Sequence, residues 1–224
     1  MTGLRRLVSG ALDLALPASC SGCGREGRAL CATCLPSLDA RLGLPGGTPI
    51  GLPADIPSPL LQLEWCAPYA GPVRGALHDL KYSGERRLAE PLGEAVARRW
   101  ARVGVGADLV VPVPVHADRE RRRGYDQAAL IAAVVTTHLR LPGARALERR
   151  RATVAQFELG RGERASNVAG AFAVGRGGEG LVSGRWVLLV DDVVTTGATL
   201  AACGEALVRA GAQAVSAIAV ARER

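Results

Sequence analysis

The sequence predicts an α/β fold, in which a mostly parallel sheet is flanked by helices and preceded by a small cysteine-rich module. From residue 61 to the C-terminus, short apolar runs that suit buried strands alternate with longer patterns that suit amphipathic helices. The runs at 108–113 and 186–190 are apolar at almost every position, which is typical of strands covered on both faces. Four cysteines within the first forty residues indicate the module.

The individual elements follow from the same patterns. Strands are expected at 61–69, 108–113, 145–148, 186–190 and 214–220. Helices are expected at 73–82, 87–103, 125–139 and 198–210, with Gly84 ending the first of them. The stretch 42–59 is rich in Gly and Pro and predicts a linker, and 175–184 predicts a surface turn. We therefore expect a module at 1–40, a linker at 41–60 and an α/β domain at 61–224.

Charge and hydropathy narrow the classes of function. The 224-residue chain has a formal net charge of +7, which favours anionic partners such as phosphates, nucleic acid or acidic lipids. Aromatic residues make up only 4% of the chain, so the alternation of aromatic and basic residues typical of single-strand binders is weak. No stretch approaches the roughly 18–20 apolar residues of a membrane span. Asp13 interrupts the apolar stretch at 4–18, so we expect an amphipathic helix there and a cytoplasmic protein.

The most informative segment follows the apolar run at 187–190. Asp191 and Asp192 come directly after this run, and the sequence Thr-Thr-Gly-Ala-Thr at 195–199 then leads into a helix. Small hydroxyl residues and a glycine let successive backbone N–H groups converge on a phosphate at a helix N-terminus. The alternative is an acid pair that merely caps a helix. A nucleoside-triphosphatase loop is excluded because the required lysine is absent.

Two further stretches offer anion contacts. After the strand at 108–113, prolines restrict the chain to extended geometry, and backbone amides near Val115 and His116 precede an arginine-rich run that ends at Arg123. His116 could bind an anion or only close the loop, and the arginine run could be a solvated surface. Arg151 and Arg164 belong to a polar stretch that could close over a bound anion and stabilise its charge if it leaves in a reaction. The alternative for that stretch is a disordered basic loop.

The cysteines form two Cys-x-x-Cys pairs separated by seven residues. Four thiolates at this spacing satisfy a closed, tetrahedral, structural zinc site, whereas a disulfide pair or a redox Cys-x-x-Cys is the alternative. The expected zinc ligands are Cys20, Cys23, Cys31 and Cys34. The isolated Cys66 and Cys203 are expected to be buried as small apolar residues.

Residues 187–199 resemble the motif with which type I phosphoribosyltransferases bind 5-phosphoribosyl 1-pyrophosphate (PRPP): four hydrophobic residues, two acids, two hydrophobic residues and a Thr/Gly-rich loop. The resemblance implies the type I phosphoribosyltransferase fold and a Mg²⁺-assisted transfer of phosphoribosyl to a nitrogen acceptor. Asp191 and Asp192 would hold the ribose hydroxyls and act in catalysis with Arg151 and Arg164. The residues expected to contact PRPP are Val115, His116, Arg123, Val190, Asp191, Asp192, Val193, Val194, Thr195, Thr196, Gly197, Ala198 and Thr199.

Taken together, the motifs resemble the ComF family of phosphoribosyltransferase-like proteins, which are associated with DNA uptake in competence. The matching pieces are the paired cysteines, Leu-Lys-Tyr at 80–82 with Gly84, Val-Pro-Val-Pro-Val-His at 111–116, Arg-Gly-Tyr-Asp-Gln at 123–127, the set Thr153, Gln156, Arg164 and Asn167, and the loop at Asp191. Asp126 departs from an expected Asn, and Tyr125 from a usual Phe.

The resemblance leaves the activity open between two classes. One is an enzyme that transfers phosphoribosyl, and the other is a non-catalytic PRPP- or nucleotide-binding adaptor. The implied partners are PRPP with an unidentified acceptor, DNA-uptake proteins or single-stranded DNA, and a second copy of the chain. Lys81 is open in the same way, because it could be a cation at a helix C-terminus or a functional residue near the substrate.

Overall fold

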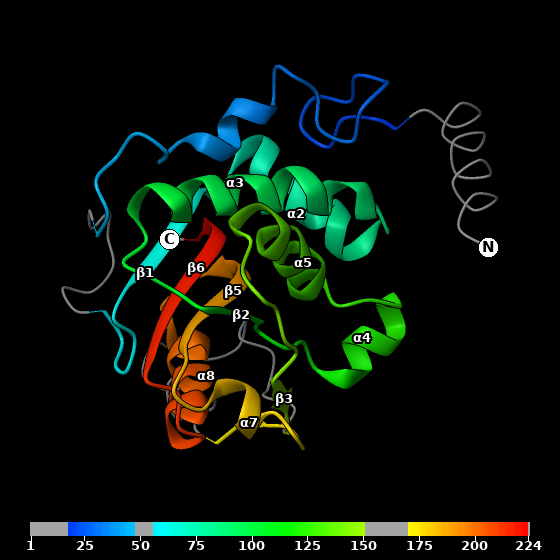
Figure 1. Ribbon diagram of the computed structural model, residues 1–224. Helices are drawn as coiled ribbons and strands as arrows, with labels where there is room; N and C mark the ends of the chain where they lie inside the picture. Colours follow the sequence, from blue (N-terminus) through cyan, green and yellow to red (C-terminus); the bar gives the residue numbers. More distant parts are fainter. Residues whose placement is uncertain (1–17, 48–55, 151–169, 224) are drawn as a thin grey trace.

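A four-stranded parallel sheet lies at the centre of the computed structural model, which describes residues 18–47, 56–150 and 170–223 (Figure 1). The strand order is β1–β6–β5–β2, formed by β1 (Leu63–Pro68), β2 (Leu109–Pro112), β5 (Trp186–Val194) and β6 (Ala214–Arg222). Along β5, Leu188 packs into one core cluster and Leu189 into the other. The expected parallel sheet, buried on both faces, is confirmed.

Helices cover both faces of this sheet (Figure 1). On one face lie α2 (Gly71–Tyr82), α3 (Ala89–Val103) and α5 (Gln127–Leu139), and on the other lies α8 (Ala198–Arg209). The packing of α3 on α5 is close, because a Cβ at Gly93 would lie 2.5 Å from the Cβ of Val134. None of the helices within the described ranges has the length and apolar character needed to cross a membrane.

Several short elements differ from expectation. The strand expected at 145–148 is β3 (Leu147–Arg149), and it pairs antiparallel with β4 (Phe172–Val174) in a separate two-stranded sheet. The expected turn at 175–184 contains the short helix α7 (Glu179–Val182), which the fully buried Val182 anchors. The arginine run forms α4 (Ala117–Arg123), which ends at Gly124 with φ +75°. Short 3₁₀ helices occur at η1 (Leu35–Asp39) and η2 (Arg86–Leu88).

The strand β5 is longer than expected. We expected it to end at residue 190, but its pairing with β6 continues, with Asp191 beside Ala219 and Val193 beside Ala221. Parallel pairing with a long buried neighbour outweighs the low strand propensity of aspartate. The acid pair therefore lies within the end of a strand and is held by the sheet rather than by a loop.

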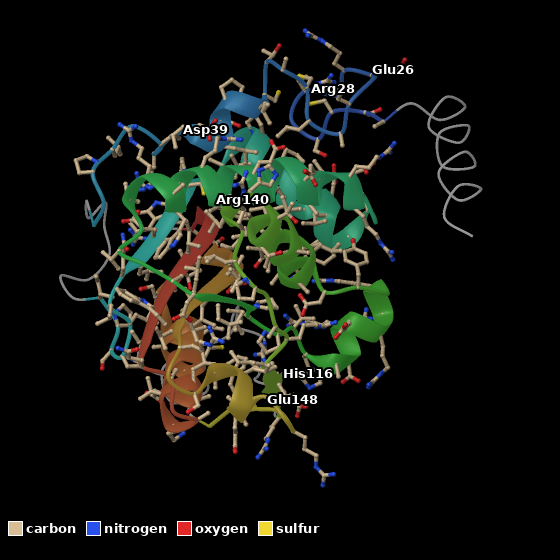
Figure 2. All side chains as sticks on the ribbon, in the orientation of Figure 1. Glu26, Arg28, Asp39, His116, Arg140 and Glu148 are labelled. Carbon is tan, nitrogen blue, oxygen red and sulfur yellow. The ribbon has the colours of Figure 1, made fainter. Side chains whose placement is uncertain are left out.

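The cysteine-rich module packs directly on α2. A Cβ at Gly75 would lie 2.1 Å from the carbonyl oxygen of Ser21, and one at Gly22 would lie 2.7 Å from the Cβ of Pro72. Leu38 of the module is fully buried in the core cluster of the α2–α3 face. Glu26 and Arg28 of the module are exposed (Figure 2). The helix expected at 4–18 falls almost wholly outside the described residues.

A buried ion pair joins the segment after the module to the domain. The side chains of Arg99 on α3 and Glu64 on β1 are 1% and 0% exposed, and Arg99 Nη2 lies 2.7 Å from Glu64 Oε2. Arg99 also donates to the carbonyl oxygens of Arg41, Leu44 and Pro45 at 2.7, 2.6 and 3.1 Å. The first residues of the expected linker are therefore fixed by hydrogen bonds to a core helix.

Candidate functional site

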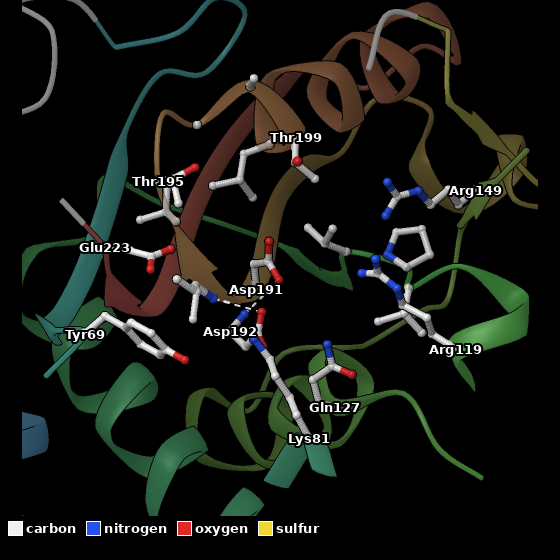
Figure 3. Close-up of a pocket in the computed structure, with 18 of the residues that line it drawn as sticks. Tyr69, Lys81, Arg119, Gln127, Arg149, Asp191, Asp192, Thr195, Thr199 and Glu223 are labelled. Atoms are coloured by element: carbon white, nitrogen blue, oxygen red, sulfur yellow. Dashed lines mark hydrogen bonds and ion pairs between the residues drawn. The ribbon is translucent and has the colours of Figure 1, made fainter. Parts of the chain in front are cut away.

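A cavity of about 300 Å³ opens where β2 and β5 end, at the carboxyl edge of the parallel sheet. Figure 3 shows that its walls come from distant parts of the chain, with Lys81 at the end of α2, Arg119 on α4, Arg149 on β3 and the acid pair on β5. Ligands of open α/β sheets bind in the crevice outside the carboxyl ends of the strands. The cavity therefore occupies the position in which this fold class holds its ligand.

Most of the residues that the sequence singled out for PRPP line this cavity. Residues 191–199, Val115 and Arg123 all do so. Val190 is instead fully buried in the core cluster that faces α5. His116 is the N-cap of α4, where its Nδ1 accepts a hydrogen bond from the backbone N–H of Asp118 at 3.2 Å (Figure 2). His116 therefore closes the turn that begins α4, which is one of the two roles that the sequence left open.

The arginine-rich stretch expected to close over the site lies outside the described residues. This applies to Arg151 and Arg164, and also to Thr153, Gln156 and Asn167 of the family pattern.

The two carboxylates of the acid pair have different surroundings. Asp192 is buried, and its Oδ2 forms an ion pair with Lys81 Nζ. Burial raises the pKa of Asp191 well above its ordinary value, and the charge of Asp192 raises it further. At Asp192 the Lys81 ammonium outweighs burial and lowers the pKa. Asp192 is therefore the more readily ionised member of the pair, and Asp191 keeps its proton more readily.

Lys81 is the only lysine in the sequence, and it lies in this cavity. Its side chain is 17% exposed, and the carboxylate of Asp192 raises its pKa despite burial. The position in the last turn of α2 also suits a cation, as one of the two readings of the sequence expected. The structure adds the ion pair, which brings Lys81 to the acid pair.

The Thr/Gly loop turns from β5 into α8 on one side of the acid pair (Figure 3). Gly197 is the N-cap of α8 with φ +82°, and a Cβ there would lie 2.9 Å from Cγ of Pro57. Only glycine meets both the left-handed backbone and the close approach. The turn leaves the first N–H groups of a 12-residue helix at the cavity, together with the hydroxyls of Thr195 and Thr199. These donors suit a phosphate.

Arginines form the opposite side of the cavity (Figure 3). Arg119 comes from α4, and Arg149 comes from the end of β3. Burial lowers the pKa of Arg149, and the nearby charge of Arg119 lowers it further. Two neighbouring guanidinium groups on one wall of a cavity suit a multivalent anion. Arg123 lies beside them and donates from Nη1 to Oε1 of Gln127 at 2.9 Å.

Asp126 has a structural contact at the same edge. Its Oδ1 accepts the backbone N–H of Ala129 at 3.1 Å, which caps α5, and its Oδ2 accepts the N–H of Val115 at 3.4 Å. Burial raises the pKa of Asp126. An asparagine has a single side-chain oxygen and could accept only one of these two bonds in the same way, so Asp126 adds an acceptor that the family pattern lacks.

Sequence reasoning missed Arg149, Tyr69 and Glu223 as cavity residues, and it treated Arg119 only as part of a charge run. Tyr69 and Glu223 directly follow the ends of β1 and β6, so they reach the same carboxyl edge as the acid pair. That position after a strand was a usable signal. For Arg149 the sequence carried no signal, because its place depends on the pairing of β3 with β4.

The four cysteines of the module form a cluster whose Sγ atoms all lie within 4.8 Å of one another. Cys20 Sγ accepts the backbone N–H groups of Gly22 at 3.4 Å and Cys31 at 3.3 Å. At Cys20 these hydrogen bonds outweigh burial and lower the pKa to about 6, whereas burial raises the pKa of Cys34 to about 12. Four converging sulfurs with N–H donors behind them fit a structural zinc ion. Cys66 and Cys203 are buried and free, as expected.

We expect one zinc ion per chain at this cluster and a large loss of stability when it is removed. Cys23 is the exposed member, so Cys23→Ser removes a ligand without disturbing a packed side chain. Zinc analysis of the purified chain and of Cys23→Ser, with thermal unfolding before and after chelation, measures both effects. Thr33→Ser, a neighbouring exposed position, is the control. A metal-free wild type whose unfolding temperature is unchanged by chelator would contradict the assignment.

Comparison with known proteins identifies the domain and its relatives. The phosphoribosyl transferase domain family matches residues 121–224. The chain is 34% identical over 204 residues to the DNA utilization protein YhgH of Escherichia coli K12, covering 88% of this chain and 85% of that protein. It is 32% identical over 116 residues to competence protein F of Haemophilus influenzae, covering 51% and 50% of the two chains.

Among solved structures, a glutamine PRPP amidotransferase from B. subtilis, complexed with ADP and GMP, covers 58% of this chain and 25% of its own. Its sequence identity is 24% and its TM-score is 0.40.

The matched segment contains β5 with its acid pair, the Thr/Gly loop, α8 and β6. These elements therefore form a phosphoribosyltransferase-type domain, and the four-cysteine module that precedes it fits a zinc ribbon. The chain belongs to the ComF family, with relatives named DNA utilization protein YhgH and competence protein F.

Proposed function

We propose that the cavity binds PRPP and that the protein transfers the phosphoribosyl group to a nitrogen acceptor. The observation that carries this proposal is the division of one cavity into three chemically different parts. A phosphate-binding helix terminus lies on one side, paired arginines lie on the other, and two carboxylates lie between them. PRPP has the same order of groups, with a 5′-phosphate, a ribose that carries two hydroxyls and a pyrophosphate.

Each part has a role in this proposal. The N–H groups and hydroxyls of 195–199 hold the 5′-phosphate. The carboxylates of Asp191 and Asp192 accept hydrogen bonds from the ribose hydroxyls, and Lys81 keeps Asp192 ionised for this purpose. Arg119 and Arg149 bind the pyrophosphate and stabilise the charge that it gains as it leaves.

The reaction is a substitution at C1′ of the ribose. A nitrogen lone pair forms the new bond to C1′, and the bond from C1′ to the pyrophosphate oxygen breaks, so the pyrophosphate leaves with that electron pair. The transition state carries positive charge on the ribose, which the carboxylates beneath it stabilise. Because no side chain forms a covalent bond in this step, the protein acts by positioning the reactants and by its electrostatic field.

Mg²⁺ fits the oxygen-rich surroundings of this site, because Asp191, Asp192 and Glu223 offer carboxylate oxygens beside the oxygens of PRPP itself. When bound, the ion would neutralise the pyrophosphate and so assist its departure.

The experiment compares PRPP with its two halves in the presence of Mg²⁺. Calorimetric titration of PRPP, ribose 5-phosphate and inorganic pyrophosphate into the protein should give the tightest binding for PRPP, because only PRPP reaches both ends of the cavity. Arg119→Gln should weaken the binding of PRPP and of pyrophosphate by about tenfold or more, because one hydrogen bond to a charged group is lost. The binding of ribose 5-phosphate should not change.

Arg121→Gln is the matched control, because Arg121 is exposed on the same helix and pairs with Asp118. Pyrophosphate binding as tightly as PRPP would reduce the site to a general anion site and contradict the proposal.

The names of the relatives support a second candidate, a non-catalytic PRPP- or nucleotide-binding adaptor in the use or uptake of DNA. DNA-uptake proteins or single-stranded DNA would then be the partners, and either role places the protein in the cytoplasm. Release of pyrophosphate from PRPP in the presence of an acceptor separates the enzyme from the adaptor.

A further inference from the structure

A second cavity, of about 610 Å³, lies next to the cavity proposed for PRPP and shares four lining residues with it. We call it the annex and define it by residues 81–84 at the end of α2, by Arg119, Arg122 and Arg123 on α4, and by Tyr125. Lys81, Tyr82, Arg119 and Arg123 line both cavities. The annex is therefore a neighbour of the place where the ribose is proposed to lie.

The charged side chains that line the annex are all positive. The acids of the neighbouring surface are engaged elsewhere, with Asp118 on Arg121 and Glu120 on Arg145. Within the part of the chain that the structure describes, no acid forms an ion pair with Arg119, Arg122 or Arg123. The annex therefore attracts an anion, and guanidinium groups favour a planar one such as a carboxylate.

An aromatic ring lies beside these cations. Tyr82 is 67% exposed, the guanidinium of Arg123 lies 5.0 Å from its ring centre, and the ring of His78 lies 5.0 Å away on the same helix. The buried Tyr125 donates its hydroxyl to the carbonyl oxygen of Leu80, which fixes the end of α2 and so the position of Tyr82. An exposed ring next to guanidinium groups suits a flat aromatic ligand that carries a negative group.

We infer that the annex binds the acceptor, and that the acceptor is a nitrogen heteroaromatic compound bearing a carboxylate. The inference rests on the proposed function, because it takes the ribose to lie over the acid pair in the first cavity. The helix terminus and the Arg119–Arg149 pair already serve the two ends of PRPP. Of the other cations of the annex, Lys81 pairs with Asp192 and Arg123 lines both cavities, whereas Arg122 lines only the annex and is thus available for the acceptor.

Transfer of phosphoribosyl to such an acceptor needs no further reactant. The ring nitrogen donates its lone pair to C1′, and pyrophosphate leaves with the electrons of the C1′–O bond. A pyridine-type nitrogen becomes a pyridinium, whereas a ring N–H releases its proton to water.

Two mononucleotides test the inference without knowledge of the natural acceptor. Nicotinate mononucleotide and nicotinamide mononucleotide share the ribose 5-phosphate and the ring and differ by a carboxylate in place of an amide. We expect wild type to bind the nicotinate form about tenfold or more tightly, the size of a hydrogen bond to a charged group. Arg122→Gln should remove most of this preference, and Arg121→Gln, the neighbouring exposed arginine, should keep it. Tyr82→Leu should weaken the binding of both compounds alike, because stacking of the ligand ring on Tyr82 does not depend on the carboxylate.

The outcomes separate the two proposals. If the folded wild type binds neither mononucleotide nor ribose 5-phosphate, the proposed function fails. If both mononucleotides bind equally, the ribose 5-phosphate site stands and the inference about the annex is overturned. It is also overturned if Arg122→Gln weakens the binding of PRPP but leaves the preference for nicotinate mononucleotide unchanged. Arg122 would then contact the pyrophosphate and not the acceptor.

Discussion

Replacing Arg99 with methionine is expected to destabilise the protein by about 3–5 kcal/mol, the cost of removing one partner of a buried ion pair. Glu64, its partner, is fully buried, and all five N–H donors of an arginine are used here, on Glu64 and on the carbonyl oxygens of the segment after the cysteine module. Loss of the guanidinium leaves Glu64 with the more distant Arg41, whose Nη2 lies 3.6 Å from Oε2, as its ion-pair partner, and it leaves these carbonyl groups without their donor. Equilibrium unfolding in urea measures the change.

Arg98→Met is the matched control for this prediction. Arg98 is the next residue on α3, but its side chain is 39% exposed and pairs with the half-exposed Asp39 at 3.0 Å. An ion pair of this kind contributes about 0–1 kcal/mol. The double variant Glu64→Leu/Arg99→Met should remain destabilised, because the carbonyl groups of Leu44 and Pro45 would still lack donors. An Arg99→Met protein as stable as Arg98→Met would contradict the account of this network.

The sheet and most of its helices could be predicted because their patterns are local. The apolar runs that became β2 and β5 read as strands buried on both faces, and the helix predicted at 198–210 matches α8. The end of β5 could not be predicted, because it is set by pairing with β6, which lies in register with it as far as Val194 and Arg222. For the same reason, the alternating pattern predicts the strand at 145–148 as part of the main sheet, although β3 pairs with β4 in a separate sheet.

The cavity was predictable only in part. The acid pair and the Thr/Gly loop are contiguous in sequence, so their chemistry could be predicted from residues 187–199. The meeting of Lys81, Arg119 and Arg149 with Asp191 depends on how α2, α4 and β3 pack around the sheet edge. The buried pair of Glu64 and Arg99 was missed, although a charged residue between Leu63 and Trp65 in a buried strand was a signal that a partner existed.

The double variant Asp191→Asn/Asp192→Asn is expected to lose binding of PRPP. Asparagine has nearly the same size as aspartate, so the fold should tolerate the change, but the amide cannot supply the negative charge that is proposed to hold the ribose hydroxyls. Two hydrogen bonds to a charged acceptor at about 1.5–3 kcal/mol each correspond to a loss of at least about a hundredfold in affinity. Lys81, whose side chain is 17% exposed, would also lose its ion-pair partner, so the variant should fold with a lower thermal stability than wild type.

The control for this variant is Asp108→Asn. Asp108 lies at the opposite end of the same sheet, where its Oδ1 accepts the backbone N–H of Trp186 at 3.0 Å. An asparagine oxygen can accept the same bond, so PRPP affinity should not change. Circular dichroism and zinc content establish that each variant is folded before its affinity is compared.

The most direct test of the central claim is calorimetric titration of PRPP with Mg²⁺ into wild type, Asp108→Asn and the acid-pair variant. The account predicts saturable binding at one site per chain in the first two proteins and none in the third. Absence of heat and of thermal stabilisation in a folded, zinc-loaded wild type would contradict it, as would undiminished binding by the folded acid-pair variant.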